Sequence, residues 1–280
     1  MRNLLSANLL RLRKSVLFWG SLAFCFGIGA LMAFQLYQMN QYEHFPLDGA
    51  FFTYPIFVCI ITAVFIPQFF GREYSDHTIR SKVTAGHPRA SIYAANLLTG
   101  TAVSLLLCAA YMAAVAMIGI PLVGPVSMDA ELAVQMVLGS LVTMAAFSAL
   151  FTLISMVSSR KSISAVVCIL GVFLLLIASI YLRSRLDAPE FYDAPEFFTE
   201  CSVNEAGEIV WVGLVDNPQY LSGTQRAVCE FLYNLLPHSQ AIQYASRQTQ
   251  NLWQMPLYSL LVILLSTGAG LLLFRRKELK

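Results

Sequence analysis

Residues 163–182, with the sequence ISAVVCILGVFLLLIASIYL, form a continuous apolar run without an acidic or basic side chain. An apolar helix of about 20 residues crosses the hydrocarbon core of a bilayer. Comparable runs occupy residues 16–36, 51–70, 92–120, 132–157 and 256–274. The whole chain is 57% hydrophobic and only 12% charged, unlike a soluble domain. We therefore predict an all-α membrane protein in which six transmembrane helices form a single domain over residues 1–280.

Basic residues are concentrated in alternate connections between these runs and at the two ends of the chain. They are Arg2, Arg11, Arg13, Lys14, Arg72, Arg80, Lys82, Arg89, Arg160, Lys161, Arg275, Arg276, Lys277 and Lys280. The remaining connections are acidic, above all the long segment 183–255 before the last run. Because cytoplasmic loops carry an excess of Lys and Arg, we expect both termini in the cytoplasm and a large extracellular loop at 183–255. The predicted location is a bacterial cell membrane, crossed several times.

The N-terminal residues 1–15 have a helical pattern of their own. Leu5, Leu9, Leu12 and Val16 recur at helical spacing, and the basic side chains lie mostly elsewhere on the helix. This pattern predicts an interfacial helix along the inner leaflet. A secretory signal is the alternative, but the following apolar run is longer than the 7–15 residues typical of one.

The six cysteines divide into two groups. Cys25, Cys59, Cys108 and Cys168 lie inside apolar runs, where cysteine usually serves as a small apolar side chain. Cys201 and Cys229 are the pair in the extracellular segment, where oxidation is possible. We predict a disulfide between them, with two free thiols as the alternative.

A second amphipathic pattern lies within the extracellular segment. Apolar residues recur at helical spacing over 227–236, directly before Pro237. This indicates a short helix on the outer leaflet, which either packs on the bundle as a lid or shapes an outward exit.

Motifs for catalysis are missing from the sequence. It contains no GxxxxGK[ST] phosphate loop, so we expect no ATPase activity in this chain and no bound cofactor. His44, His77, His87 and His238 are scattered without HExxH or CxxC partners, which argues against a metal site. The apolar runs hold no histidine and almost no charge, which disfavours intramembrane hydrolysis and ion-coupled transport. The basic clusters are not interleaved with aromatics as in nucleic-acid binding proteins. Energy for any uphill transport therefore enters from outside the membrane.

The inner connection at residues 71–91 has the features of a short helix. Ser75 or Asp76 can cap its start, Ile79 and Val83 share one face, and Gly86 can end it. Such a helix, parallel to the membrane and joined to two spanning helices, can transmit a partner's motion into the bundle. The alternative is a solvated loop whose basic residues only satisfy the positive-inside rule.

Residues 71–93 resemble the inner loop of ABC-2-type permeases, the membrane subunits of a class of ATP-driven exporters. In that family a Tyr, an acidic residue, Thr-Ile-Arg, Lys, Gly and Arg recur, and they are matched here by Tyr74, Asp76, Thr78, Ile79, Arg80, Lys82, Gly86 and Arg89. Further matches lie at 153–156 followed by 160–161, at 217–220, at 222–226 and at 236–237. The sequence departs from the family at His77, where related sequences often carry Gly.

The resemblance implies that residues 76–86 form a cytoplasmic coupling helix between the second and third spanning helices. This helix would bind a groove of a separate subunit that binds ATP and Mg²⁺, and Val83 joins the matched residues in the expected contact region. Two permease subunits, identical or different, would pair in the lipid bilayer around the translocation path. The expected function is export of a peptide antibiotic, drug or lipid. The alternative is an immunity or sensor protein that captures a cationic peptide on its acidic extracellular loop without pumping it.

Overall fold

The computed structural model describes residues 1–158, 160–192, 201–203, 207, 209–211, 215–248 and 252–277. The chain divides into two compact units, of which the first comprises Met1–Leu176 with Asn234–Lys280 and the second Ile177–Tyr233. The prediction of one domain over residues 1–280 stays a prediction.

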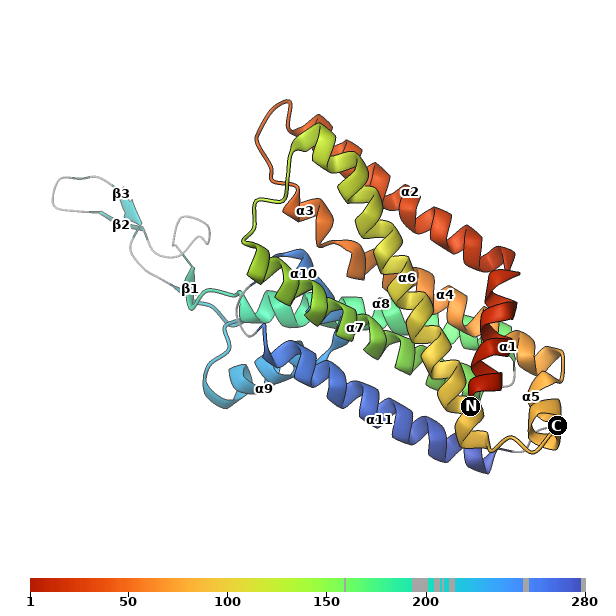
Figure 1. Ribbon diagram of the computed structural model, residues 1–280. Coiled ribbons are helices and arrows are strands. Elements are labelled where there is room, and N and C mark those ends of the chain that lie inside the picture. The colour runs from red at the N-terminus through yellow and green to blue at the C-terminus, as the bar shows by residue number, and fades with distance from the viewer. Residues whose placement is uncertain are drawn as a thin grey trace. The chain divides into compact units, whose positions relative to one another are not determined.

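Six helices in the described part of the chain are long and apolar enough to cross a membrane. They are α2 (Val16–Met39), α4 (Tyr54–Ser75), α6 (Arg89–Val123), α7 (Ala130–Val157), α8 (Lys161–Leu186) and α11 (Gln254–Arg276), shown in Figure 1. Shorter helices are α1 (Arg2–Arg13), α3 (Asp48–Phe51), α5 (Thr78–Thr84), α9 (Gly223–Leu235) and α10 (Pro237–Ala245). The predicted helical membrane protein with six spans is thus confirmed.

The second unit also contains short strands, which the sequence did not predict. β1 (Phe191–Tyr192) pairs antiparallel with β4 (Val215–Asp216), and β2 (Cys201–Val203) pairs antiparallel with β3 (Ile209–Trp211). The predicted disulfide is not confirmed, because Cys229 carries a free thiol and the side chain of Cys201 lies outside the described residues. The predicted amphipathic helix before Pro237 corresponds to α9.

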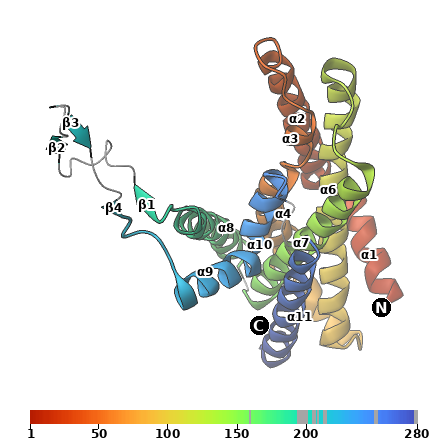
Figure 2. The same ribbon diagram turned by 90° about the vertical axis from the view of Figure 1, so that its left-hand side faces the viewer.

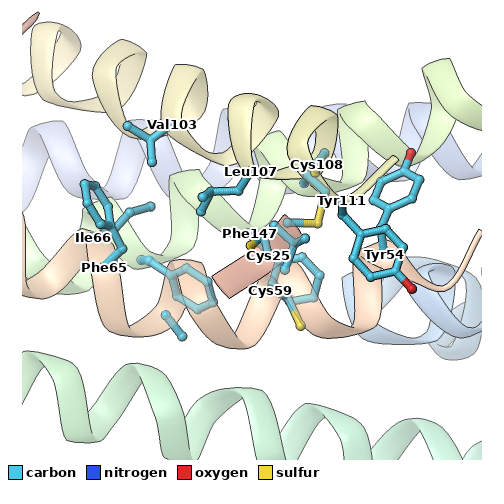
Figure 3. Packing of buried hydrophobic residues seen from close by; sticks show 14 of the residues in the cluster. Cys25, Tyr54, Cys59, Phe65, Ile66, Val103, Leu107, Cys108, Tyr111 and Phe147 are labelled. Carbon is cyan, nitrogen blue, oxygen red and sulfur yellow. The ribbon is translucent and has the colours of Figure 1, made fainter. Parts of the chain in front are cut away.

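The core of the first unit is built by α2, α4, α6 and α7. Figure 3 shows its centre, where the cysteines of α2, α4 and α6 pack among aromatic and branched side chains. Cys25, Cys59, Cys108 and Cys168 are all fully buried, as expected of small apolar side chains. Gly29 of α2 permits close contact with α6, since a Cβ there would lie 3.0 Å from the Cβ of Ala114.

Helix α1 buries only part of the face predicted to be apolar. Of the residues assigned to that face, Leu12 is buried in the protein and Leu9 is 53% exposed, while Val16 is the first residue of α2 and is 85% exposed. Leu4 and Asn8 are buried together with Leu12. The predicted position of this helix along the inner leaflet stays a prediction. Asn8 is buried because its side chain finds hydrogen-bond partners on α6, which compensates for the loss of water. The buried face of α1 therefore consists of Leu4, Asn8 and Leu12, and α1 packs against α6.

Candidate functional site

Helix α5 is defined by special backbone conformations at both ends. It follows His77, whose backbone is left-handed at φ 53°, and it ends before Gly86 at φ 85°. The amide of Gly86 donates to the carbonyl of Val83 at 3.0 Å, and that of His87 to the carbonyl of Lys82 at 3.2 Å. This is a Schellman motif, which confirms the predicted role of Gly86 as the end of the helix.

The predicted start of α5 is wrong. Ser75 is the last residue of α4, Asp76 follows it, and His77 precedes the first residue of α5 without a capping side-chain hydrogen bond. The left-handed backbone at His77 gives a physical reason for the Gly that is common here in the sequences this loop resembles, because Gly adopts positive φ without steric cost.

One face of α5 is anchored in the bundle by apolar contacts. Ile79 is only 1% exposed and belongs to a buried cluster with side chains from α1, α6, α7 and α11. These side chains are Leu4, Ile92, Tyr93, Ala95, Met156 and Phe274, with Tyr74 and Val83 packed against them. Ile79 and Val83 share a face, as the sequence predicted. Helix α5 is thus a packed element rather than a solvated loop.

A buried carboxylate beneath α5 connects three further helices to it. Glu73, in the last turn of α4, is fully buried and forms ion pairs with Arg11 of α1 and Lys82 of α5, the latter at 2.6 Å. It also accepts a hydrogen bond from the Asn96 side chain of α6 at 3.2 Å. The Asn8 amide of α1 donates to the Asn96 side chain at 2.8 Å. We call Glu73, Arg11, Lys82, Asn96 and Asn8 the Glu73 network.

Glu73, Asn8 and Asn96 were not predicted as site residues from the sequence. A signal was present for Asn8, because a polar residue stands at helical spacing between Leu4 and Leu12. For Glu73 the available signal was an acidic residue at the end of an apolar run, next to a basic loop. Neither signal indicates which residues Asn8 and Glu73 contact in the folded protein.

Tyr74 and Arg89 fasten the same region to α7 and α11. The Tyr74 hydroxyl donates to the carbonyl of Met156, the penultimate residue of α7. The Arg89 guanidinium donates to the carbonyls of Phe274, Arg275 and Lys277 at 3.2, 2.8 and 2.6 Å. These carbonyls lie at the C-terminal end of α11, where a positive charge is stabilised by the helix dipole. Figure 1 shows α1 and the end of α11 on the same side of the bundle as α5.

Lys277 adds a further contact to this region. Its ammonium group lies 3.9 Å from the ring centroid of Tyr74 and donates to the Met156 carbonyl at 3.1 Å. Burial lowers the pKa of Lys277 to about 8, although the ring and the carbonyl both favour the charged form.

The opposite face of α5 is exposed. Asp76, Arg80, Ser81, Thr84 and Gly86 are accessible to solvent. Among the predicted site residues, Tyr74, Thr78, Ile79, Lys82, Val83 and Arg89 therefore hold the helix in place, and Asp76, Arg80 and Gly86 lie at the surface. Thr78 contributes by donating its hydroxyl to the carbonyl of Glu73 at 3.1 Å. Helix α5 thus presents a small polar surface to solvent, while its other face is packed against the bundle.

A second polar cluster lies at the other ends of α4 and α7. There α10 packs between α4 and α7 (Figure 2) and buries His238 and Gln240 completely. The Gln240 side-chain oxygen accepts hydrogen bonds from Thr143 at 2.8 Å and from Ser259 at 2.5 Å. The Nδ1 atom of His238 lies 4.0 Å from the Cys59 sulfur. Burial lowers the pKa of His238 to about 4, so this side chain is neutral near neutral pH.

The comparisons with known proteins are consistent with a transport role. A family model described as "ABC-2 family transporter protein" matches residues 4–179, which is more than half of the chain. The matched residues include α5 and the complete Glu73 network. A search of curated proteins found no match.

Proposed function

Because the chain belongs to the ABC-2 family of transporter proteins, we propose that it exports a substrate when a separate ATP-binding subunit docks on the exposed face of α5. The family identifies the chain as the multi-pass permease subunit of an ABC transporter and implies an ATP-binding partner. The family's membrane subunit is generally not the ATPase. Export direction, substrate and the mode of coupling are our proposal.

The two-faced packing of α5 is the observation that carries this proposal. Ile79 and Val83 fix one face to the bundle, while Arg80 and Thr84 are exposed and accessible to a partner. Since α5 joins α4 to α6 with only a few residues on either side, a displacement of α5 moves the ends of both spanning helices. The Glu73 network and the bonds of Arg89 extend this connection to α1 and α11.

We further propose that this end of the bundle is cytoplasmic. The basic residues of α1, α5 and the end of α11 gather here, in accord with the positive-inside rule. Both termini then lie in the cytoplasm of a bacterial cell, and α1 lies along the inner leaflet. A second permease subunit, identical or different, completes the translocation path in the bilayer. A peptide antibiotic, a drug or a lipid is the proposed substrate.

The test separates the exposed from the buried residues of α5. We expect Arg80→Glu to reduce about tenfold the amount of ATP-binding subunit that copurifies with the permease from native membranes, because the substitution reverses a charge on the docking face. A tenfold change corresponds to about 1.4 kcal/mol of binding free energy. Lys14→Glu is the control, since Lys14 is exposed on a different connection. The copurified subunit is quantified by mass spectrometry, relative to the permease. Equal recovery with both variants would exclude α5 as the docking element.

The buried residue of α5 is expected to act differently. Ile79→Ala removes apolar contacts inside the cluster and destabilises the protein by about 2–5 kcal/mol. It should therefore lower the amount of folded protein, whereas Arg80→Glu should leave that amount unchanged.

The alternative function, capture of a cationic peptide without pumping, relies on the acidic extracellular loop. Among its described acidic residues, Asp187 pairs with Arg183 and Glu230 with Arg226, so part of its negative charge is already neutralised. The two functions differ in their need for ATP. If protection of cells against a peptide antibiotic persists when the partner's ATPase is inactivated, export is excluded and capture is supported.

A further inference from the structure

The second compact unit contains a hollow between the last turns of α8 and the first turns of α9. Its volume is about 370 Å³, and Tyr181, Arg185, Leu221, Thr224, Gln225 and Val228 line it. All of these residues lie within Ile177–Tyr233, so the hollow belongs to this unit alone.

Arg185 gives the hollow a positive charge. The other arginines of this unit have acidic partners one helical turn away, with Arg183 3.2 Å from Asp187 and Arg226 3.1 Å from Glu230. Arg185 is partly buried and has no acidic partner among the described residues. A planar guanidinium binds phosphate oxygens in a bidentate manner, and the Thr224 hydroxyl and the Gln225 amide add hydrogen-bond donors in the same lining.

The depth of the hollow in the membrane follows from the length of α8. This helix has 26 residues. At about 1.5 Å per residue it is about 39 Å long, which exceeds the hydrocarbon thickness of about 30 Å. Its last turns, which carry Tyr181 and Arg185, therefore extend into the headgroup layer. Tyrosine is enriched at this depth, and Tyr181 is 61% exposed.

The other wall of the hollow is apolar and continues onto an exposed apolar face. Leu221 is buried, and Val228 extends toward Phe231 and Leu232 on one side of α9. These three side chains of α9 are 51%, 48% and 39% exposed. An amphipathic helix with such a face lies in the membrane interface, with its apolar side toward the acyl chains.

We propose that this hollow binds the phosphate headgroup of a phospholipid from the leaflet at that end of α8. Arg185 holds the phosphate, Thr224 and Gln225 donate hydrogen bonds to its oxygens, and Leu221 and Val228 contact the glycerol and the first acyl carbons. The assignment requires only that α8 spans a bilayer, and it is independent of the proposed export function.

Native mass spectrometry of the full-length protein, titrated with phosphatidylglycerol in mild detergent, tests the assignment. We expect Arg185→Gln to weaken lipid binding about tenfold. Arg226→Gln is the matched control, because Arg226 is paired with Glu230 and does not line the hollow, and it should bind as the wild type does. Diacylglycerol with the same acyl chains lacks the phosphate and should bind equally to all three proteins.

Equal binding of phosphatidylglycerol by the wild type and Arg185→Gln would overturn the proposal. Complete displacement of the lipid by millimolar inorganic phosphate would also overturn it, since the proposed contacts of Leu221 and Val228 with the glycerol and the acyl chains would then contribute nothing to binding. Should Arg185→Gln not fold, Thr224→Val provides the same comparison by removing one exposed hydrogen-bond donor. A loss of phosphatidylglycerol binding by that variant, with diacylglycerol binding retained, supports the proposal, and unchanged binding of both lipids contradicts it.

Discussion

Glu73 is a buried carboxylate at the end of a spanning helix, and its neighbours explain how it is tolerated there. Two cations from α1 and α5 and the Asn96 amide surround its oxygens. A buried charge is expensive to desolvate, and pairing with hydrogen bonds offsets this cost. Removing the carboxylate leaves Lys82 and Arg11 without their partner, in a region where Lys82 is 15% and Arg11 33% exposed.

We therefore expect Glu73→Ala to destabilise the purified protein by about 3–5 kcal/mol, since breaking a buried pair leaves an uncompensated charge. Thermal unfolding in detergent measures this change. Glu230→Ala breaks the exposed pair with Arg226 and should cost no more than about 1 kcal/mol. Similar unfolding temperatures for the two variants would show that the Glu73 network does not stabilise the fold.

At the level of the single element, α10 is the most unusual helix of the first unit. It is short, yet Pro237, Ser239, Gln240 and Gln243 are buried along with His238. Its polar side chains are accommodated because Thr143 of α7 and Ser259 of α11 provide hydrogen bonds to Gln240. The helix therefore depends on hydrogen-bond partners on two spanning helices. These partners are neutral hydroxyl groups, so they do not compensate a charge placed on α10.

His238 makes the stability of this element sensitive to acid. Its pKa is lowered from 6.5 to about 4 by burial, so between these values the unfolded chain binds a proton that the folded chain does not. Stability therefore falls as the pH decreases from 6.5 to 4, by up to roughly 3 kcal/mol. We expect the unfolding temperature of the wild type to decrease over this range by more than that of His238→Gln, which cannot titrate. Parallel pH profiles of the two proteins would contradict this expectation.

For the whole molecule, orientation in the membrane decides which surfaces a partner can reach. Helix α1, the exposed face of α5 and the end of α11 lie at one end of the first unit (Figure 1). Within the second unit, Cys229 is a partly accessible free thiol, whereas Cys25, Cys59, Cys108 and Cys168 are buried. A reagent that labels accessible thiols can therefore distinguish the two sides of the membrane.

We expect a membrane-impermeant maleimide to label Cys229 in intact cells that carry the Cys201→Ser variant, because the segment 183–255 is predicted to be extracellular. Ser81→Cys in a Cys201→Ser, Cys229→Ser background is the control for the other side, since Ser81 is exposed on α5 and should react only after permeabilisation. The reverse pattern would show that the termini are extracellular. In the wild type, labelling of Cys229 that requires a reductant would indicate the predicted disulfide.

Several features could be predicted from the sequence because they depend on local properties. The transfer of an apolar helix into hydrocarbon depends on its own side chains, so the six spans were found near their observed bounds. The end of α5 was also found, because a left-handed residue after a helix strongly favours glycine. The start of α5 was not predicted correctly. His77 adopts the left-handed backbone conformation there, although glycine is the residue type that normally indicates this conformation.

The sequence by itself determined a helical membrane protein with six spans, and it identified the loop that joins the second span to the third. Only the tertiary structure decided which face of α1 is buried, that Glu73 connects α1, α4, α5 and α6, and that the polar α10 packs between two spanning helices. The physical reason is that burial of a polar side chain costs free energy unless a partner satisfies its hydrogen bonds. Asn8 and Asn96 are 88 residues apart in the chain, so no local pattern records that they meet.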